Sequence, residues 1–167
     1  MGEHSTVRDT RLSPYQQELE ERLQSVLDRL DRGQVTADSG LRIEREGRHW
    51  VLRLSVEARD DRIPGLNLYA SPNQCILGFA QSEQLECHSQ PGAVDNLIDE
   101  VVKLTERYLA GVTVIEHRDS RGRDIRKDFF FGLSSEGAPE ARIGTLRRMS
   151  PRRVEDRLAF SFRFLKE

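Results

Sequence analysis

An α+β fold, with two amphipathic helices on one face of a mainly antiparallel sheet of about six to eight strands, is predicted by three features of the sequence. Two segments repeat apolar residues at steps of three and four, as amphipathic helices do. Several others alternate apolar and polar residues, as strands with one buried face do. Short turn sequences join these segments, so consecutive strands should run antiparallel. The chain of 167 residues suits one domain, and we expect it at residues 13–167, after a flexible N-terminus at residues 1–12.

The first helix is predicted to begin at Ser13-Pro14, because a capping serine precedes a proline and Gln16 stands at the capping-box position. We expect it to end at Arg32-Gly33. Its apolar stripe is Tyr15, Leu19, Leu23, Val26, Leu27 and Leu30. Its acidic face offers three candidate partner contacts, Glu18, Glu21 and Asp28.

A β-hairpin is predicted next, because Leu41–Glu46 and His49–Val56 alternate around Glu46-Gly47, which is typical of a two-residue turn. That register places Ile43 opposite Trp50, with both side chains on the core face. The single tryptophan is therefore interpreted as a core residue.

A surface loop is predicted from Glu57 to Pro72, with at most a short strand at Leu66–Tyr69, since Pro64-Gly65 and several charges interrupt it. Long loops often carry binding residues. Adjacent carboxylates in such a loop are more often solvated than metal-bound. The candidate contacts here are Asp60, Asp61, Arg62 and Asn67.

The two cysteines, Cys75 and Cys87, are expected to be reduced. A short hairpin around Ser82-Glu83 would place Cys87 opposite Gly78, so the thiols would not face each other. Two reduced cysteines, the absence of a long apolar run and the absence of an apolar N-terminal stretch together predict a cytoplasmic protein.

A second helix is expected to end at Gly111 in a left-handed conformation. The strands Val112–Arg118 and Arg123–Phe131 should follow, joined by a type I turn with a glycine bulge at residues 119–122. The register pairs Glu116 with Arg126 on one face.

One further pairing and the position of His117 follow from the same register. Arg118 should lie opposite Asp124, and His117 on the other face of the sheet. His117 is therefore interpreted as a partly buried strand residue rather than as an acid or base.

The C-terminal strand alternates four large apolar residues with small or charged ones, which makes it a predicted main contributor to the core. These residues are Leu158, Phe160, Phe162 and Phe164. Arg142–Ser150 is a further candidate strand.

Charge is unevenly distributed along the chain. Residues 1–111 contain 13 Lys/Arg and 19 Asp/Glu, whereas residues 112–167 contain 13 and 9. A basic patch near the C-terminus could bind phosphate backbones, although the isoelectric point of about 6.1 is low for a nucleic-acid-binding protein. The patch consists of Arg147, Arg148, Arg152, Arg153 and Arg157.

The sequence contains none of the standard catalytic or nucleotide motifs, such as a P-loop, a dinucleotide-binding glycine pattern, paired zinc-binding histidines or a nucleophile elbow. We therefore assign no catalytic, cofactor-binding or metal-binding residue. A non-enzymatic module that binds another protein is the favoured class, with the oligomeric state open.

The chain resembles small bacterial immunity proteins of polymorphic toxin systems in its size, its element order and the segment Tyr108–Val112, which leads from helix into hairpin. The resemblance implies an antitoxin-like inhibitor that neutralises a cognate toxin by occluding its active site. The chain is also similar to type III secretion chaperones, which begin with a helix and strands and bind an effector protein. Nucleic-acid binding through the arginine cluster is a third alternative.

Overall fold

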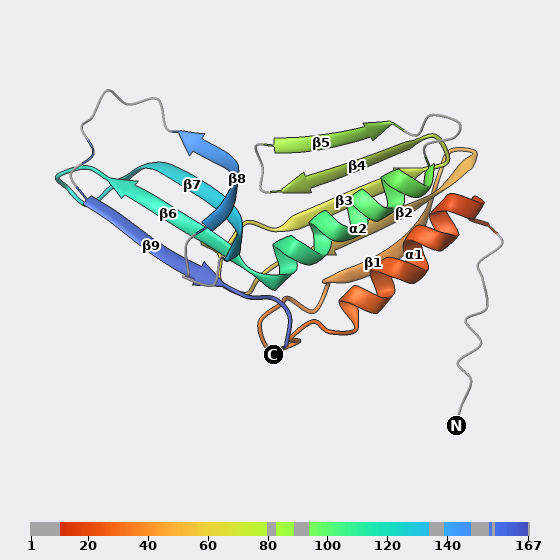
Figure 1. The fold of residues 1–167 in the computed structure, drawn as a ribbon, viewed down its shortest axis with the longest axis horizontal. Coiled ribbons are helices and arrows are strands. Elements are labelled where there is room, and N and C mark those ends of the chain that lie inside the picture. The colour runs from red at the N-terminus through yellow and green to blue at the C-terminus, as the bar shows by residue number, and fades with distance from the viewer. Residues whose placement is uncertain are drawn as a thin grey trace.

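Two helices and nine strands make up the described part of the protein (Figure 1). This computed structural model describes residues 11–79, 83–88, 94–133, 139–147, 154 and 156–166. The helices are α1 (Pro14–Leu27) and α2 (Val94–Ala110). The first five strands are β1 (Gly40–Glu46), β2 (His49–Val56), β3 (Leu66–Ser71), β4 (Gln74–Phe79) and β5 (Glu83–His88). The last four are β6 (Val112–Arg118), β7 (Asp124–Leu133), β8 (Pro139–Arg147) and β9 (Asp156–Phe162).

The strands form two antiparallel sheets, which confirms the predicted α+β class. One sheet has five strands in the order β1-β2-β3-β4-β5, and the other has four in the order β8-β7-β6-β9. There are more strands than predicted, and they are divided in two because α2 separates the first five from the last four along the chain. None of the described helices is long and apolar enough to cross a membrane.

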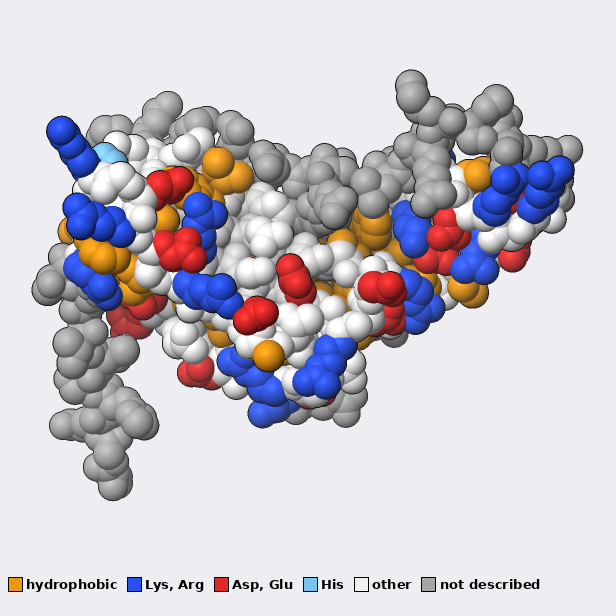
Figure 2. Space-filling model, turned by 180° about the vertical axis from the view of Figure 1, so that it is seen from behind, with side chains coloured by type: hydrophobic (Ala, Val, Ile, Leu, Met, Phe, Trp, Pro, Cys, Tyr) orange, Lys and Arg blue, Asp and Glu red, His pale blue; other side chains and the backbone are white. Residues whose placement is uncertain are grey.

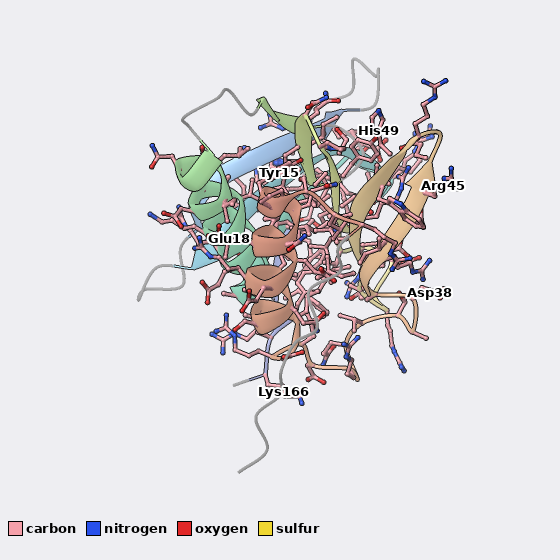
Figure 3. The ribbon with its side chains drawn as sticks, turned by 90° about the vertical axis from the view of Figure 1, so that its right-hand side faces the viewer. Tyr15, Glu18, Asp38, Arg45, His49 and Lys166 are labelled. Atoms are coloured by element: carbon pink, nitrogen blue, oxygen red, sulfur yellow. The ribbon has the colours of Figure 1, made fainter. Side chains whose placement is uncertain are left out.

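Both helices cover the same face of the five-stranded sheet, as predicted. Figure 1 looks onto the helices, and Figure 2 shows the molecule from behind, the side to which the uncovered face of this sheet is turned. Seen from the end, α1 and α2 lie on one side and β1 and β2 on the other (Figure 3).

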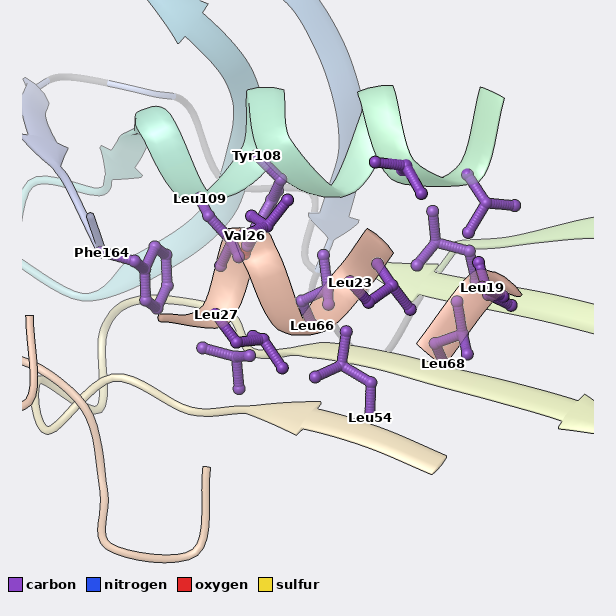
Figure 4. Close-up of a cluster of buried hydrophobic side chains, with 14 of the residues drawn as sticks. Leu19, Leu23, Val26, Leu27, Leu54, Leu66, Leu68, Tyr108, Leu109 and Phe164 are labelled. Carbon is purple, nitrogen blue, oxygen red and sulfur yellow. The ribbon is translucent and has the colours of Figure 1, made fainter. Parts of the chain in front are cut away.

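A hydrophobic core fills the space between the helices and this sheet (Figure 4). The side chains of Leu23 in α1, Leu52 in β2 and Leu66 in β3 are completely buried. The core continues into the four-stranded sheet through Val114 and Phe129. One apolar core therefore connects both sheets.

The start of α1 is confirmed, with the Ser13 N–H donating to Gln16 Oε1 at 2.9 Å. Two residues assigned to the flexible N-terminus also pack on the fold. Leu12 is buried, and the Arg11 guanidinium lies 4.5 Å from the centre of the Trp50 ring. Trp50 itself is only half-buried, because it lies at the end of β2.

The predicted end of α1 is wrong, because the helix stops at Leu27. Leu30 instead forms a β-bridge with Leu165 near the C-terminus. The Asp31 N–H donates to the carbonyl of Phe164 at 2.8 Å. The C-terminal segment therefore supplies the hydrogen bonds that a further helical turn would have made.

The predicted register of the first hairpin is wrong by two residues. Ile43 pairs with Leu52, and Glu46 belongs to β1 opposite His49. The turn is instead Gly47-Arg48, because Gly47 has the positive φ of +61° that such turns require. A shift of two residues keeps every side chain on its predicted face.

The expected long loop is shorter than predicted, because β3 is a full strand between β2 and β4. Leu66, Leu68 and Ala70 of β3 are buried beneath the helices, while Asn67 is exposed. The loop between β2 and β3 is therefore residues 57–65, and Asn67 is a strand residue rather than a loop residue.

The end of α2 before Gly111 and the hairpin that follows are confirmed, including Gly122 at φ +70°. Gly111 is not left-handed, however, because its φ is not positive. Its N–H donates to the Tyr108 carbonyl at 3.2 Å. A bulge in the register also pairs Glu116 with Lys127 instead of Arg126.

The C-terminal strand contributes less to the core than predicted. Phe164, just beyond β9, is completely buried, but Phe160 and Phe162 are half-buried and Leu158 is 41% exposed. The reason is that β9 is an edge strand of the four-stranded sheet. The candidate strand at Arg142–Ser150 corresponds to β8, which begins earlier.

The predicted register of the second hairpin is also wrong. Cys75 of β4 pairs directly with Cys87 of β5, and Gly78 pairs with Gln84. Glu83, which was expected in the turn, is the first residue of β5.

Candidate binding surface

The open face is our name for the side of the five-stranded sheet that the helices leave uncovered. Alternation along the strands directs Arg42 of β1, Arg53 of β2, and Tyr69 of β3 to this side, since their neighbours in sequence face the helices. Figure 2 shows acidic and basic side chains interspersed on this side of the molecule. The open face is therefore polar and of mixed charge.

A row of small residues crosses the open face and forms a trough. Gly40, Ser55, Asn67 and Gly78 are successive partners on four neighbouring strands. A hollow of about 430 Å³ lies over the β2–β4 part of this row. A second hollow of about 330 Å³ lies over its β1 end, and Ser55 lines both. The small side chains leave the trough open beside the larger Arg42, Arg53 and Tyr69.

The wall of the trough is built from Arg53 and Tyr69. The guanidinium of Arg53 lies 5.0 Å from the centre of the Tyr69 ring and forms an ion pair with Glu44 at 2.9 Å. The Tyr69 hydroxyl donates to Glu46 Oε2 at 2.8 Å, and this hydrogen bond raises the pKa of Tyr69. Hydrogen bonding, ion pairing and stacking therefore hold both side chains in place.

The length of the trough fits a short extended peptide. Four neighbouring strands span three inter-strand distances, about 14 Å at about 4.8 Å each. An extended chain advances about 3.3 Å per residue, so about four residues fit across the row. The end at β1 is lined by Asp38 and Glu57, so the trough has an acidic end beside the cationic Arg42.

Of the predicted contact residues, Asn67 lies in the trough, and the Asp60–Arg62 segment lies in the loop that begins beside it. Only the pair Val56 and Leu66 separates the row from that loop. Arg62 is held by Asp60, with Nη2 and Oδ2 2.6 Å apart, and its guanidinium lies 4.5 Å from the Phe160 ring.

The same hydrogen bonds from Arg62 lower the pKa of Asp60 to about 2. Asp60 is therefore occupied by a guanidinium, and Asp61 beside it is exposed. The arrangement anchors the loop to the four-stranded sheet. It does not combine the two carboxylates in one site.

The three predicted acidic contacts of α1 lie elsewhere. Glu18 and Glu21 of the helix and Asp28, which follows its last residue, are exposed, and Glu18 points away from the sheet in Figure 3. Glu18 is within 4.0 Å of Arg22, which also pairs with Asp99 of α2. The predicted contact residues thus lie on two opposite sides of the molecule and do not form one site.

Sequence reasoning missed the residues that shape the trough, namely Arg42, Arg53, Ser55, Tyr69 and Gly78. Most of them occupy the polar positions of the alternating strands. In the sequence, those positions indicated only which residues are not in the core. Their convergence depends on registers between strands, which alternation within one strand does not specify.

A second polar cluster lies in the four-stranded sheet around the buried Glu116. Its carboxylate accepts from Lys127 at 2.9 Å and from Arg118 at 2.6 Å. Burial raises the pKa of Glu116, but the hydrogen bonds from Lys127 and Arg118 outweigh burial, so that its pKa lies below 4.5. Arg118 also pairs with Asp124 at 3.1 Å, as predicted. These contacts neutralise Glu116 and give it a structural role.

His117 lies on the opposite face of β6 and is buried. Its Nε2 lies 2.8 Å from Asp128 Oδ2, and the same carboxylate accepts two hydrogen bonds from Arg126. Asp128 therefore joins β6 and β7 through side chains as well as through the backbone. The predicted placement of His117 on a strand is confirmed.

Within the described ranges, no group of three or more His, Cys, Asp or Glu residues is arranged to hold a metal ion. Most of the predicted arginine cluster lies outside the described residues, which include only the backbone of Arg147 and the exposed Arg157. No protein-family model, curated protein or solved structure matches the chain.

Proposed function

We propose that the protein is a non-enzymatic binding module that recognises another protein through the open face. The trough is the observation that carries the proposal, because it places four small residues in register beside a pre-ordered arginine and tyrosine. Arg and Tyr are enriched among the residues that dominate protein–protein binding energy. A short extended segment of the partner would lie across the four strands.

The shape and chemistry of the surface favour a protein over a small apolar ligand. Small-molecule sites are mostly concave and apolar and enclose most of the ligand. The trough instead lies on an exposed sheet surface and carries Arg42, Arg53 and Glu44. The space between the helices and the sheet is occupied by core leucines (Figure 4).

Within this class we propose an immunity protein that acts in the bacterial cytoplasm and neutralises a cognate toxin by covering its active site. Asn67 in the trough and the adjacent loop with Asp60, Asp61 and Arg62 would make the contacts. Together they offer positive and negative charges as well as hydrogen-bond donors and acceptors. A protein surface with interspersed charges requires all of these for complementarity.

Co-expression tests this proposal. The product of the adjacent gene is expressed with and without this protein, and growth and co-purification are measured. We expect the protein to relieve growth inhibition and to co-purify as a complex. A partner that is toxic with equal strength in both cultures, and that does not co-purify, would contradict the immunity role.

One register brings basic residues together and underlies the alternative of nucleic-acid binding, although two of them, His117 and Arg126, are bound to Asp128. Arg157, His117, Arg126 and Arg147 are successive partners across the four strands of the second sheet. A phosphate-binding surface there would retain the protein on heparin, with an affinity that falls steeply with salt. Under our proposal, retention is weak and Arg157→Ala leaves it unchanged.

A further inference from the structure

The two cysteines of the chain occupy one pair of facing positions. Cys75 of β4 and Cys87 of β5 are direct partners in an antiparallel ladder. They are the only cysteines among 167 residues. Direct partners in an antiparallel ladder lie on the same face of a sheet, so the two positions share one face.

This pair of positions matches the span of a disulfide bond. Direct antiparallel partners have Cα atoms about 4.5–5.5 Å apart. Disulfides join Cα atoms about 4.4–6.8 Å apart, so no rearrangement of the ladder is needed. The register expected from the sequence instead placed Cys87 opposite Gly78, so that the two thiols would not face each other.

The surroundings favour slow, selective oxidation. Cys75 is completely buried in the core, so reagents do not reach its sulfur directly. β5 is the edge strand of its sheet and pairs with β4 alone among the described strands. Edge strands open more readily than central ones, and the first step of an exchange therefore falls to Cys87.

We propose that Cys75 and Cys87 are a site of reversible oxidation, at which a small disulfide such as oxidised glutathione is reduced and a cross-strand disulfide forms. The Cys87 thiolate attacks the small disulfide, which forms a mixed disulfide and releases one glutathione thiolate. The Cys75 thiolate then attacks the Cys87 sulfur and releases the second glutathione. Two electrons pass to the small disulfide, and the protons of the two cysteines end on the two glutathione molecules.

The bond would fasten the edge strand to the strand that carries Gly78 at one end of the trough. It would close the hairpin from Cys75 to Cys87 and restrict the unfolded chain. The inference rests on the register alone and is independent of the proposed binding function.

The test is to incubate the reduced, folded, dilute protein with oxidised glutathione and to measure its intact mass after acid quenching. We expect a monomeric species lighter by two hydrogen atoms, with a Cys75–Cys87 linked peptide, and we expect dithiothreitol to restore the original mass. The oxidised protein should melt on the order of 5 °C above the reduced protein.

Cys87→Ser and Cys75→Ala are the matched controls, and neither should yield the lighter species or the shift in melting temperature. A parallel reaction in urea shows whether the bond depends on the native pairing of the two strands. The Cys75–Cys87 disulfide should form faster in the folded protein than in urea. The proposal is overturned if the folded protein yields only glutathione adducts or dimers linked between chains, or if the intramolecular bond forms only in urea.

Discussion

Gln16 is a buried polar side chain that joins α1 to two strands. Its Nε2 donates to the Trp50 carbonyl at 3.0 Å and to the Ala70 carbonyl at 2.7 Å. Tyr15 beside it donates to the Ser71 carbonyl, and burial raises the pKa of the Tyr15 hydroxyl. These bonds fix the position of the helix along the sheet, because apolar packing alone has little direction.

Replacing Gln16 with leucine should therefore destabilise the protein, although the two side chains are similar in volume. Two carbonyls would each lose a donor in a buried site, and we expect a loss of about 1 to 3 kcal/mol in the free energy of unfolding. Urea denaturation measures it, with the exposed Gln24→Leu as control. Equal midpoints for the two variants would show that Gln16 does not carry this role.

Glu116 makes stability depend on pH in a defined direction. Its native pKa lies below its ordinary value of 4.5, because the hydrogen bonds from Lys127 and Arg118 outweigh burial. Between the two values the unfolded chain binds a proton that the native protein does not. The stabilisation is therefore complete above 4.5 and is lost as the pH falls through the native pKa.

The Glu116→Gln variant should remove this part of the pH dependence. We expect the free energy of unfolding, measured by urea denaturation from neutral pH to below 4.5, to fall less with decreasing pH in the variant than in the wild type. Asp60, with its pKa of about 2, contributes to both proteins alike. A variant with the same or a steeper decline would refute the role given to Glu116.

At the scale of elements, the C-terminal segment closes the fold. The Phe164 N–H donates to the Leu109 carbonyl at 3.0 Å, and the Lys166 N–H donates to the Arg29 carbonyl at 2.8 Å. The Phe164 ring packs with its centre 5.7 Å from that of Tyr108. The segment therefore connects the turn after α1 with the end of α2. Phe164, the completely buried residue of this region, lies beyond the end of β9.

Alanine substitutions along this strand should differ sharply. Phe164→Ala should cost about 3 to 5 kcal/mol, because a completely buried ring is removed. Leu158→Ala should cost less than about 1 kcal/mol, since Leu158 is 41% exposed. Thermal and urea unfolding measure both, with Phe164→Leu as a milder variant if the alanine variant does not fold. Similar losses of stability in Phe164→Ala and Leu158→Ala would contradict this account. They would support the sequence-based prediction that both residues belong to the core.

Residues close together in sequence predicted helix ends and turns well, but they predicted contacts between distant segments poorly. The start of α1, the end of α2 and the turn at Gly122 depend on residues close in sequence, and all were found. The end of α1 was missed because Leu165, far along the chain, bridges Leu30. β3 was expected only as a short strand at Leu66–Tyr69, because Pro64-Gly65 and its polar outer residues obscured the full strand, which runs from Leu66 to Ser71.

The residues of the candidate site could likewise be predicted singly from the sequence, but their arrangement could not. Asn67 was identified as a contact residue from its polar surroundings, but its place in the trough depends on its partners Ser55 and Gly78. Residues brought together across strands carry no joint signal in a single sequence. The Cys75–Cys87 pairing is missed for the same reason, because the turn between the strands sets the register.

At the scale of the molecule, the layers separate two candidate surfaces. The helices occupy one side of the five-stranded sheet, so the acidic residues of α1 and the trough face opposite ways (Figure 3). The Arg62 contact with Phe160 joins the β2–β3 loop to the second sheet. The open face and this loop adjoin each other across the pair Val56 and Leu66, and this is the side at which the proposed partner would bind.

A paired charge substitution tests this assignment most directly. Asn67→Arg places a large cation in the trough, and Glu21→Arg places one on the outer face of α1; both positions are exposed. Affinity for the adjacent-gene product is measured by calorimetry, after thermal melts establish that both variants are folded. We expect Asn67→Arg to weaken binding at least about tenfold, or about 1.4 kcal/mol, and Glu21→Arg to leave it within about twofold. Weakened binding in Glu21→Arg, with Asn67→Arg unaffected, would contradict the account and assign recognition to α1.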